Sequence, residues 1–275
     1  MPRPAIGRFG AVFMLLTMAS MSLAACASSV AIPAQNVPES RMPTQPLLGD
    51  FTLPGGKGPF PAMIVLHGCS GRGPSQDIWA QRLNGWGYAA LIPDSYSPRG
   101  FTGNCVGLVD QRPITPRDRA GDVISAALWL RTRPEIDGAR IGVIGFSNGG
   151  VTAELVTQRR YEQLYPGLLK ALVAYYGDCS HPEEHGTVPL LVLAGEADDW
   201  GFPARGCRAF GAALTPGPIF EIHTYPGAVH SFDNTRAVQR SWNQGHPMQY
   251  DFTAAQDSFE RAKTFLDRYM GHRTD

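Results

Sequence analysis

The 275-residue chain has no excess of charge of either sign, because 24 lysines and arginines balance 24 aspartates and glutamates. Such a chain has no net field that would recruit a nucleic acid or an anionic membrane surface. It also has no internal repeat, no sign of a second domain and, beyond residue 25, no apolar run long enough to cross a bilayer. We therefore expect one globular domain that binds its ligand at a local site, with no nucleic-acid partner.

The first residues have the features of a secretory signal peptide. Arg3 and Arg8 precede an apolar stretch over residues 11–23, which is shorter than the roughly 20 residues that a membrane-spanning helix needs. The segment Leu23-Ala-Ala-Cys26 that follows is typical of a lipoprotein signal, in which the cysteine carries the lipid. Ordinary signal cleavage close to the same point is the alternative.

Three segments follow from this interpretation. We expect a signal peptide over residues 1–25, a lipid-anchored tether over 26–45, which is rich in Ser, Pro, Ala and Gln, and a single folded domain over 46–275. The expected product is an exported bacterial lipoprotein, held on the periplasmic or cell-surface side of a membrane through Cys26.

A G-x-S-x-G pentapeptide is centred on Ser147. The β-branched run Ile141-Gly-Val-Ile144 precedes it and the segment 151–156 supplies a helix after it, which is the strand-turn-helix context of a nucleophile elbow. Gly145 and Gly149 leave room for the neighbouring backbone at this sharp turn. The alternative is an ordinary glycine-rich turn with an inert serine.

Strand signals alternate with helix signals from residue 60 onward. The strand patterns cover residues 62–67, 88–93, 140–146, 171–176, 189–194 and 219–225, and the helix patterns cover 77–86, 116–133, 149–160, 203–214 and 252–270. This alternation predicts an α/β fold with a mostly parallel, doubly wound sheet and helices on both faces. Before residue 60 only one weak strand is visible, over 47–53. Ligands bind at the carboxyl ends of the strands in such sheets, so the functional residues should follow strands.

Two such strand ends supply partners for the serine. A serine hydroxyl needs a base in hydrogen-bond reach and a third group that orients the base. Asp198 follows the strand that ends near Ala194, and His230 follows the strand that ends near Thr224. The chain order Ser147, Asp198, His230 is that of nucleophile, acid and histidine in α/β-hydrolases.

Other acids and histidines remain as rivals. Asp199 is the main rival for the acid and Glu196 a more distant one. His223 lies within a predicted strand, and His67 belongs to the loop after the first core strand.

The segment His67-Gly-Cys-Ser-Gly71 has the form of a loop that contributes a backbone donor to an oxyanion hole. We expect the backbone N–H groups of Cys69 and Asn148 to bind the tetrahedral oxyanion, each donor contributing about 3 to 4 kcal/mol. An ordinary glycine turn is the alternative.

Four cysteines follow Cys26, an even number that suggests disulfides in an exported chain. Four cysteines allow three pairings. The predicted strand order favours Cys69 with Cys105 and Cys179 with Cys207. A zinc site in the stretch 179–185 is the rival interpretation; Pro182 prevents a regular helical pair of its histidines, so we expect no metal.

With these motifs the chain resembles the dienelactone hydrolase family of the α/β-hydrolase superfamily, over roughly Pro59 to Leu266. The resemblance rests on the segments 60–68, 93–100, 145–150, 195–200 and 225–233. It implies an α/β-hydrolase fold and places the acid three residues after the glycine, at Asp198. The short region before residue 60 suggests that the first strands of the superfamily's sheet are missing or reduced. The enzymes that give the family its name use a cysteine nucleophile, whereas this chain has Ser147, so the resemblance implies a more general serine esterase.

We therefore expect a serine hydrolase that cleaves small-molecule carboxylic esters or lactones through an acyl-enzyme on Ser147, without a cofactor. A peptidase or amidase with the same triad, and a non-catalytic lipoprotein with a hydrolase fold, are the alternatives.

The loops 95–115 and 231–251 are expected to wall the pocket. The candidate lining aromatics are Phe101, Trp200, Phe232 and Trp242, and the candidates for a contact with a substrate carboxylate are Arg99 and Arg236.

Overall fold

The computed structural model describes residues 1, 27–38, 40–41, 45–105, 113–179, 184–201, 203–213 and 219–271. The elements in these ranges are β1 (Ser28–Ile32), β2 (Leu47–Thr52), β3 (Phe60–Leu66), α1 (Pro74–Gly85), β4 (Ala89–Asp94), the short 3-10 helix η1 (Ser97–Arg99), α2 (Pro116–Arg131), β5 (Ile136–Phe146), α3 (Asn148–Leu155), α4 (Arg159–Leu164), β6 (Leu172–Tyr175), β7 (Leu190–Gly195), α5 (Pro203–Ala213), β8 (Phe220–Tyr225), β9 (Ser241–Asn243), β10 (His246–Met248) and α6 (Phe252–Met270). None of the described helices combines the length and the apolar character needed to span a membrane.

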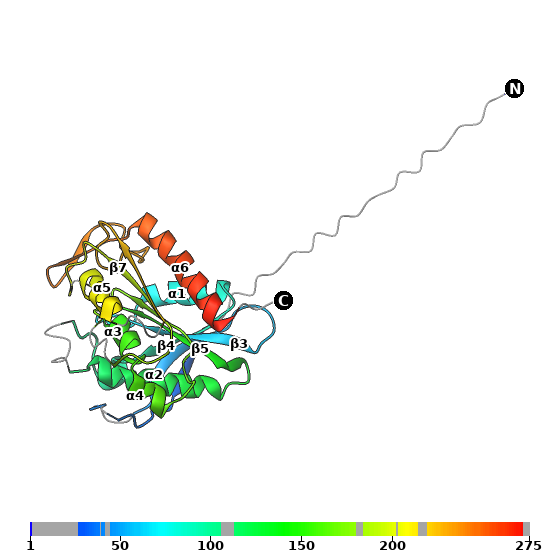
Figure 1. Ribbon diagram of the computed structural model, residues 1–275. Helices are drawn as coiled ribbons and strands as arrows, with labels where there is room; N and C mark the ends of the chain where they lie inside the picture. The colour runs from blue at the N-terminus through cyan, green and yellow to red at the C-terminus, as the bar shows by residue number, and fades with distance from the viewer. Residues whose placement is uncertain are drawn as a thin grey trace.

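An eight-stranded sheet runs through the molecule in the order β1-β2-β4-β3-β5-β6-β7-β8. The strands from β3 to β8 are parallel, and β2 is antiparallel to both of its neighbours. Parallel neighbours need crossover connections, which the helices provide (Figure 1). The predicted α/β-hydrolase fold is confirmed.

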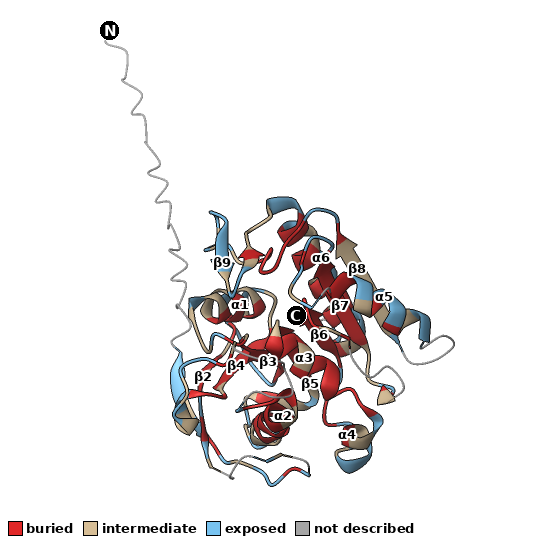
Figure 2. Cartoon of the chain, turned by 90° about the vertical axis from the view of Figure 1, so that its left-hand side faces the viewer, coloured by how far each residue is buried: buried red, intermediate tan, exposed pale blue. Residues whose placement is uncertain are grey.

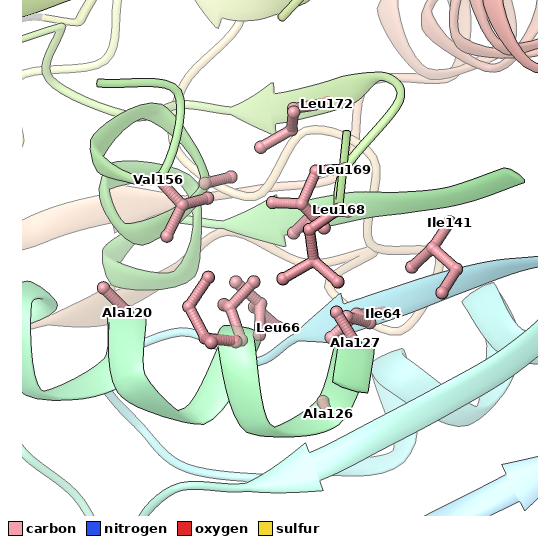
Figure 3. Packing of buried hydrophobic residues seen from close by; sticks show 14 of the residues in the cluster. Ile64, Leu66, Ala120, Ala126, Ala127, Ile141, Val156, Leu168, Leu169 and Leu172 are labelled. Atoms are coloured by element: carbon pink, nitrogen blue, oxygen red, sulfur yellow. The ribbon is translucent and has the colours of Figure 1, made fainter. Parts of the chain in front are cut away.

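Helices cover both faces of the sheet because the central strands are apolar on both sides. Side chains alternate along β3, so Ile64 and Leu66 join the cluster that contains the inner face of α2, whereas Met63 and Val65 join the cluster that contains α1 and α6. Figure 3 shows Ile64 beside Ala127 of α2 and Leu66 further along the same helix. Figure 2 shows the buried sheet with exposed outer faces on α4 and α5. The sheet is therefore a rigid core from which loops project at the strand ends.

The N-terminal part of the sheet corrects the prediction of missing or reduced strands. β1 and β2 are both present and pair with each other, and Ile32 and Leu47 are fully buried. Residues 28–32 consequently belong to the folded domain and not to a tether over 26–45. An edge strand buries few side chains, and Ser28-Ser29 at the start of β1 are exposed, so the apolar pattern that marks a strand is weak here.

The helix boundaries differ from the predictions mainly around the pentapeptide. The helix predicted over 149–160 is two helices, α3 and α4, separated by residues 156–158. The predicted helix over 116–133 is α2, which starts after Thr115 because the threonine hydroxyl accepts the Asp118 N–H while the Asp118 carboxylate accepts the Thr115 N–H. The carboxyl ends of β3, β5, β6, β7 and β8 lie at the same edge of the sheet, where the predicted functional residues follow them.

Candidate active site

Ser147 lies on a sharp turn between β5 and α3. Its backbone has φ 55° and ψ −119°, in a region that residues with a side chain rarely adopt. A side chain at Gly145 would collide with the Gly149 carbonyl, and one at Gly149 would place its Cβ 2.5 Å from the Leu66 carbonyl oxygen. The strain at Ser147 is therefore held by close backbone packing on both sides, as the pentapeptide predicts.

His230 and Asp198 form a buried pair across the loops after β8 and β7. The distance from His230 Nδ1 to Asp198 Oδ2 is 2.7 Å, and the side chains are 4% and 0% exposed. The other carboxylate oxygen of Asp198 accepts the backbone N–H of Trp200 at 2.9 Å, which fixes the carboxylate. Since Nδ1–H donates to Asp198, the remaining ring nitrogen of His230 is left to accept a proton.

The rival acids and histidines lie elsewhere. Asp199 pairs with His246 at 3.0 Å, and Glu196 pairs with Arg208 at the surface. His223, partly exposed, pairs with Asp257 at 3.4 Å. The structure therefore brings Asp198, and not Asp199 or Glu196, against His230.

Ser147 and His230 line the same pocket. Among the described residues no hydrogen bond joins the serine hydroxyl to the His230 ring. Such contacts are often long in an enzyme without substrate and tighten in the complex. The arrangement places Ser147 and His230, the candidate nucleophile and base, on one cavity, with Asp198 hydrogen-bonded to the histidine.

The loop after β3 lies beside the serine. A Cβ built on Gly68 would sit 3.5 Å from the Ser147 Cβ, and Cys69 lines the pocket next to it. Asn148 is the first residue of α3, so its backbone N–H has no acceptor within the helix. The two predicted oxyanion donors therefore belong to segments that flank the serine.

His67 is a structural residue of this loop. It is completely buried, its Nδ1 is 2.8 Å from the Gly68 carbonyl oxygen, and its Nε2 accepts the Ser95 N–H at 3.1 Å. Burial and the nearby Arg119 guanidinium hold the pKa of His67 well below its ordinary value. A neutral ring with both nitrogens engaged cannot serve as the base.

The two disulfides have the predicted pairing, Cys69 with Cys105 and Cys179 with Cys207. Glu154 lies against Cys179, and burial raises the pKa of the Glu154 carboxyl well above its usual range.

The residues of the rival zinc site are engaged otherwise or lie outside the described residues. Cys179 is bonded to Cys207, and His185 contacts the Thr157 hydroxyl at 2.6 Å. His181, like the predicted lipid attachment residue Cys26, lies outside the described residues.

A cavity of about 160 Å³ lies over the serine. It is lined by Gly68, Cys69, Ser70, Gly71, Ser75, Gln76, Trp79, Phe146, Ser147, Tyr176, Trp200, His230, Ser231, Asp233, Asn234, Asn243 and Met248. Of the four aromatic side chains expected in the wall, Trp200 alone is among these, since Phe232 belongs to the core and Trp242 is 65% exposed.

Neither arginine proposed for a substrate carboxylate lines the cavity. The Arg99 side chain is 7% exposed and pairs with Asp122 at 2.7 Å, which satisfies both charges. Arg236 is exposed. The described lining contains no lysine or arginine.

Part of the lining was missed by the sequence prediction. Trp79 of α1 and Tyr176 after β6 both donate to Asp233, with distances of 2.8 Å from Trp79 Nε1 and 2.7 Å from Tyr176 Oη. Burial raises the pKa of the Asp233 carboxyl. The position of Tyr176 directly after a strand could have marked it as a candidate lining residue. Nothing in the sequence indicates that the Trp79 side chain points into the pocket.

Comparisons with known proteins found a matching family model and similar sequences. A family model described as the dienelactone hydrolase family matches residues 50–270. A carboxymethylenebutenolidase of Pseudomonas putida is 25% identical over 203 residues, which cover 65% of this chain and 78% of that protein.

Solved structures share the fold. A dienelactone hydrolase from Anabaena variabilis superposes with a TM-score of 0.60 at 17% identity, covering 90% of this chain and 99% of that one. A dienelactone hydrolase-like promiscuous phosphotriesterase from metagenomic libraries gives a TM-score of 0.68 at 21% identity, covering 90% and 100%.

Proposed function

Because the chain belongs to the dienelactone hydrolase family and is a carboxylic ester hydrolase, we propose that it cleaves its ester or lactone substrate through an acyl-enzyme on Ser147. The observation that carries the proposal is the buried His230–Asp198 pair on the same pocket as a strained serine. That combination of a turn, a base and an orienting acid is what a serine nucleophile requires.

The reaction proceeds in two halves. His230 accepts the Ser147 proton while the serine oxygen bonds to the substrate carbonyl carbon, and the resulting oxyanion is bound by the backbone N–H groups of Cys69 and Asn148. The bond to the alcohol oxygen then breaks as His230 returns the proton to it. Water attacks the acyl-enzyme with His230 again as base, and the acid product and free Ser147 are released. Asp198 holds the imidazole in the orientation and tautomer that this requires.

The pocket favours a neutral substrate. The described lining offers no lysine or arginine to a substrate carboxylate. The relative from Pseudomonas putida is named as a carboxymethylenebutenolidase. The resemblance implies that the enzymes that give the family its name use a cysteine nucleophile, whereas this chain has Ser147. We therefore propose neutral esters as the preferred substrates of this serine enzyme.

A panel of nitrophenyl esters of increasing acyl length tests this function, with a lactone, a peptide nitroanilide and an ester that carries a free carboxylate as comparisons. We expect turnover of short neutral esters and little turnover of the peptide. His230→Ala should lower kcat by several orders of magnitude, whereas His223→Ala, which changes a partly exposed histidine outside the pocket, should not.

Two results would contradict the proposal. Faster turnover of the peptide than of every ester would favour a peptidase or amidase. A correctly folded protein that turns over none of these substrates would favour a non-catalytic protein.

We propose further that Cys26 carries a lipid that anchors the exported protein to a membrane, supported by the Leu-Ala-Ala that precedes it and the apolar stretch over 11–23. Cys26→Ser should release the protein from the membrane fraction. A mature wild-type protein that begins at another residue would refute this anchor.

A further inference from the structure

Arg119 of α2 is a completely buried arginine that the proposed mechanism does not use. Its guanidinium donates three hydrogen bonds, from Nη1 to Asn148 Oδ1 at 2.5 Å, from Nη2 to the His67 carbonyl oxygen at 2.7 Å and from Nε to the Ser95 hydroxyl at 3.2 Å. All three acceptors are neutral groups.

The charge of Arg119 has no carboxylate in direct contact among the described residues. Among the residues that the structure describes, no carboxylate oxygen lies within 4 Å of this guanidinium. The nearest acids along α2 have direct partners of their own, since Asp122 pairs with Arg99 at 2.7 Å and Asp118 caps the helix. The Asp122 carboxylate interacts with the Arg119 charge only at longer range. An arginine stays charged when buried, and a buried cation without a counterion is costly. An anion that forms nearby during the reaction would offset that cost.

The contacts of Arg119 join the two halves of the proposed oxyanion hole. The His67 carbonyl belongs to the peptide group that leads into Gly68 and Cys69, the first donor segment. The Asn148 side chain belongs to the residue that supplies the second donor, and Tyr96 also contacts its Oδ1, at 3.3 Å. One rigid, planar group therefore joins the His67 carbonyl to the Asn148 side chain, on the two segments that flank Ser147.

We propose that Arg119 is a positioning residue of the oxyanion hole, which fixes both donor segments and whose positive charge, paired directly with no carboxylate, stabilises the oxyanion. The inference rests on the proposed serine mechanism. It predicts that loss of the charge affects the tetrahedral state much more than the binding of the uncharged ester.

Four variants separate charge, geometry and stability. Arg119→Met removes the charge, Arg119→Lys keeps the charge without the fork of donors, and Asn148→Asp leaves Arg119 in place but gives it an acidic partner. Leu130→Ala is the matched control, because it opens a cavity under the same helix without touching the hole.

The readouts are kcat and KM for a nitrophenyl ester, the inhibition constant of an arylboronic acid, thermal stability, and the fraction of protein that a fluorophosphonate labels. The boronic acid is a suitable probe because its boron becomes a tetrahedral anion when the serine oxygen bonds to it. Arg119→Met should lower kcat about 100-fold with KM within about threefold, a loss of the size seen for one oxyanion donor. Boronate affinity should fall in parallel, and Arg119→Lys should be intermediate.

Asn148→Asp is the second variant, read together with Arg119→Met and Arg119→Lys, and it keeps the test open should Arg119→Met not fold. Pairing with Arg119 should preserve or raise the melting temperature, while kcat and boronate affinity fall at least tenfold. Leu130→Ala should melt earlier with unchanged kcat per labelled site.

A purely structural role for Arg119 would give the opposite pattern. Full kcat and boronate affinity in Asn148→Asp, or in the labelled fraction of Arg119→Met, would overturn the inference. A wild-type protein that neither turns over esters nor reacts with the fluorophosphonate would instead refute the proposed function itself.

Discussion

The disulfide between Cys69 and Cys105 ties a proposed oxyanion donor to the loop that follows η1. Removing it in the double variant Cys69→Ala/Cys105→Ala keeps the backbone N–H of residue 69 but releases the loop. The bridge spans 36 residues, and in the chain-entropy treatment a link of that span contributes about 3.8 kcal/mol to stability. The variant should therefore unfold at a clearly lower temperature.

The effect on activity should exceed what the stability loss explains. Other contacts still hold the loop, among them the Asn104 N–H donating to the Cys69 carbonyl at 2.6 Å. We therefore expect partial loosening of the donor and a fall in kcat of roughly tenfold to a hundredfold, less than the complete loss of one donor. The assay is ester turnover at a temperature at which both wild type and variant are fully folded by circular dichroism.

The second bridge provides a matched control. Cys179 and Cys207 are 28 residues apart, which corresponds to about 3.6 kcal/mol in the same treatment, and neither lines the pocket. Cys179→Ala/Cys207→Ala should lose similar stability but retain kcat within about threefold. Equal losses of kcat in the two double variants, or none in the first, would refute the link between the Cys69–Cys105 bridge and the oxyanion hole.

Two further variants probe the packing at Gly149 and the protonation of the buried His185. Gly149→Ala should abolish ester turnover and destabilise the fold, because its Cβ would lie 2.5 Å from the Leu66 carbonyl oxygen and 2.6 Å from that of His67. Chemical denaturation and ester turnover are the assays. A variant with wild-type stability and activity would contradict this prediction. His185 is buried, and burial lowers its pKa from 6.5 to about 4. Between these values the unfolded chain binds the proton and the folded chain does not, so stability should fall as the pH drops through this window. His185→Asn should reduce that pH dependence in urea unfolding at pH 7 and pH 4.5, and an unchanged dependence would show that His185 does not cause it.

The sequence predicted the parallel core well because its strands carry long apolar runs. The run over residues 140–146 marks β5, and the residues after each strand converge by topology alone. That is why Asp198 and His230, 32 residues apart, could be expected to meet, and their side chains lie 2.7 Å apart. The same topology gave the disulfide pairing.

Features that depend on tertiary packing were not predictable in the same way. The sequence of β1 has only a weak apolar pattern because an edge strand buries few side chains, although Ile32 at its end is fully buried. Arg99 was a candidate for contact with a substrate carboxylate, but its side chain pairs with Asp122. Arg119 lies between two acids in the sequence, a pattern typical of a solvated helix face, and only the packing of α2 against the loop after β3 buries it beside that loop.

The central claim is that catalysis passes through an acyl-enzyme on Ser147, and trapping that intermediate tests it most directly. Wild-type protein mixed with nitrophenyl acetate and quenched in acid within the first turnover should carry one acetyl group, which peptide mapping by mass spectrometry should locate on Ser147. Ser147→Ala should carry none and should not turn over the ester. Turnover that persists in Ser147→Ala, or an acetyl group that maps to another residue in a productive cycle, would contradict the mechanism.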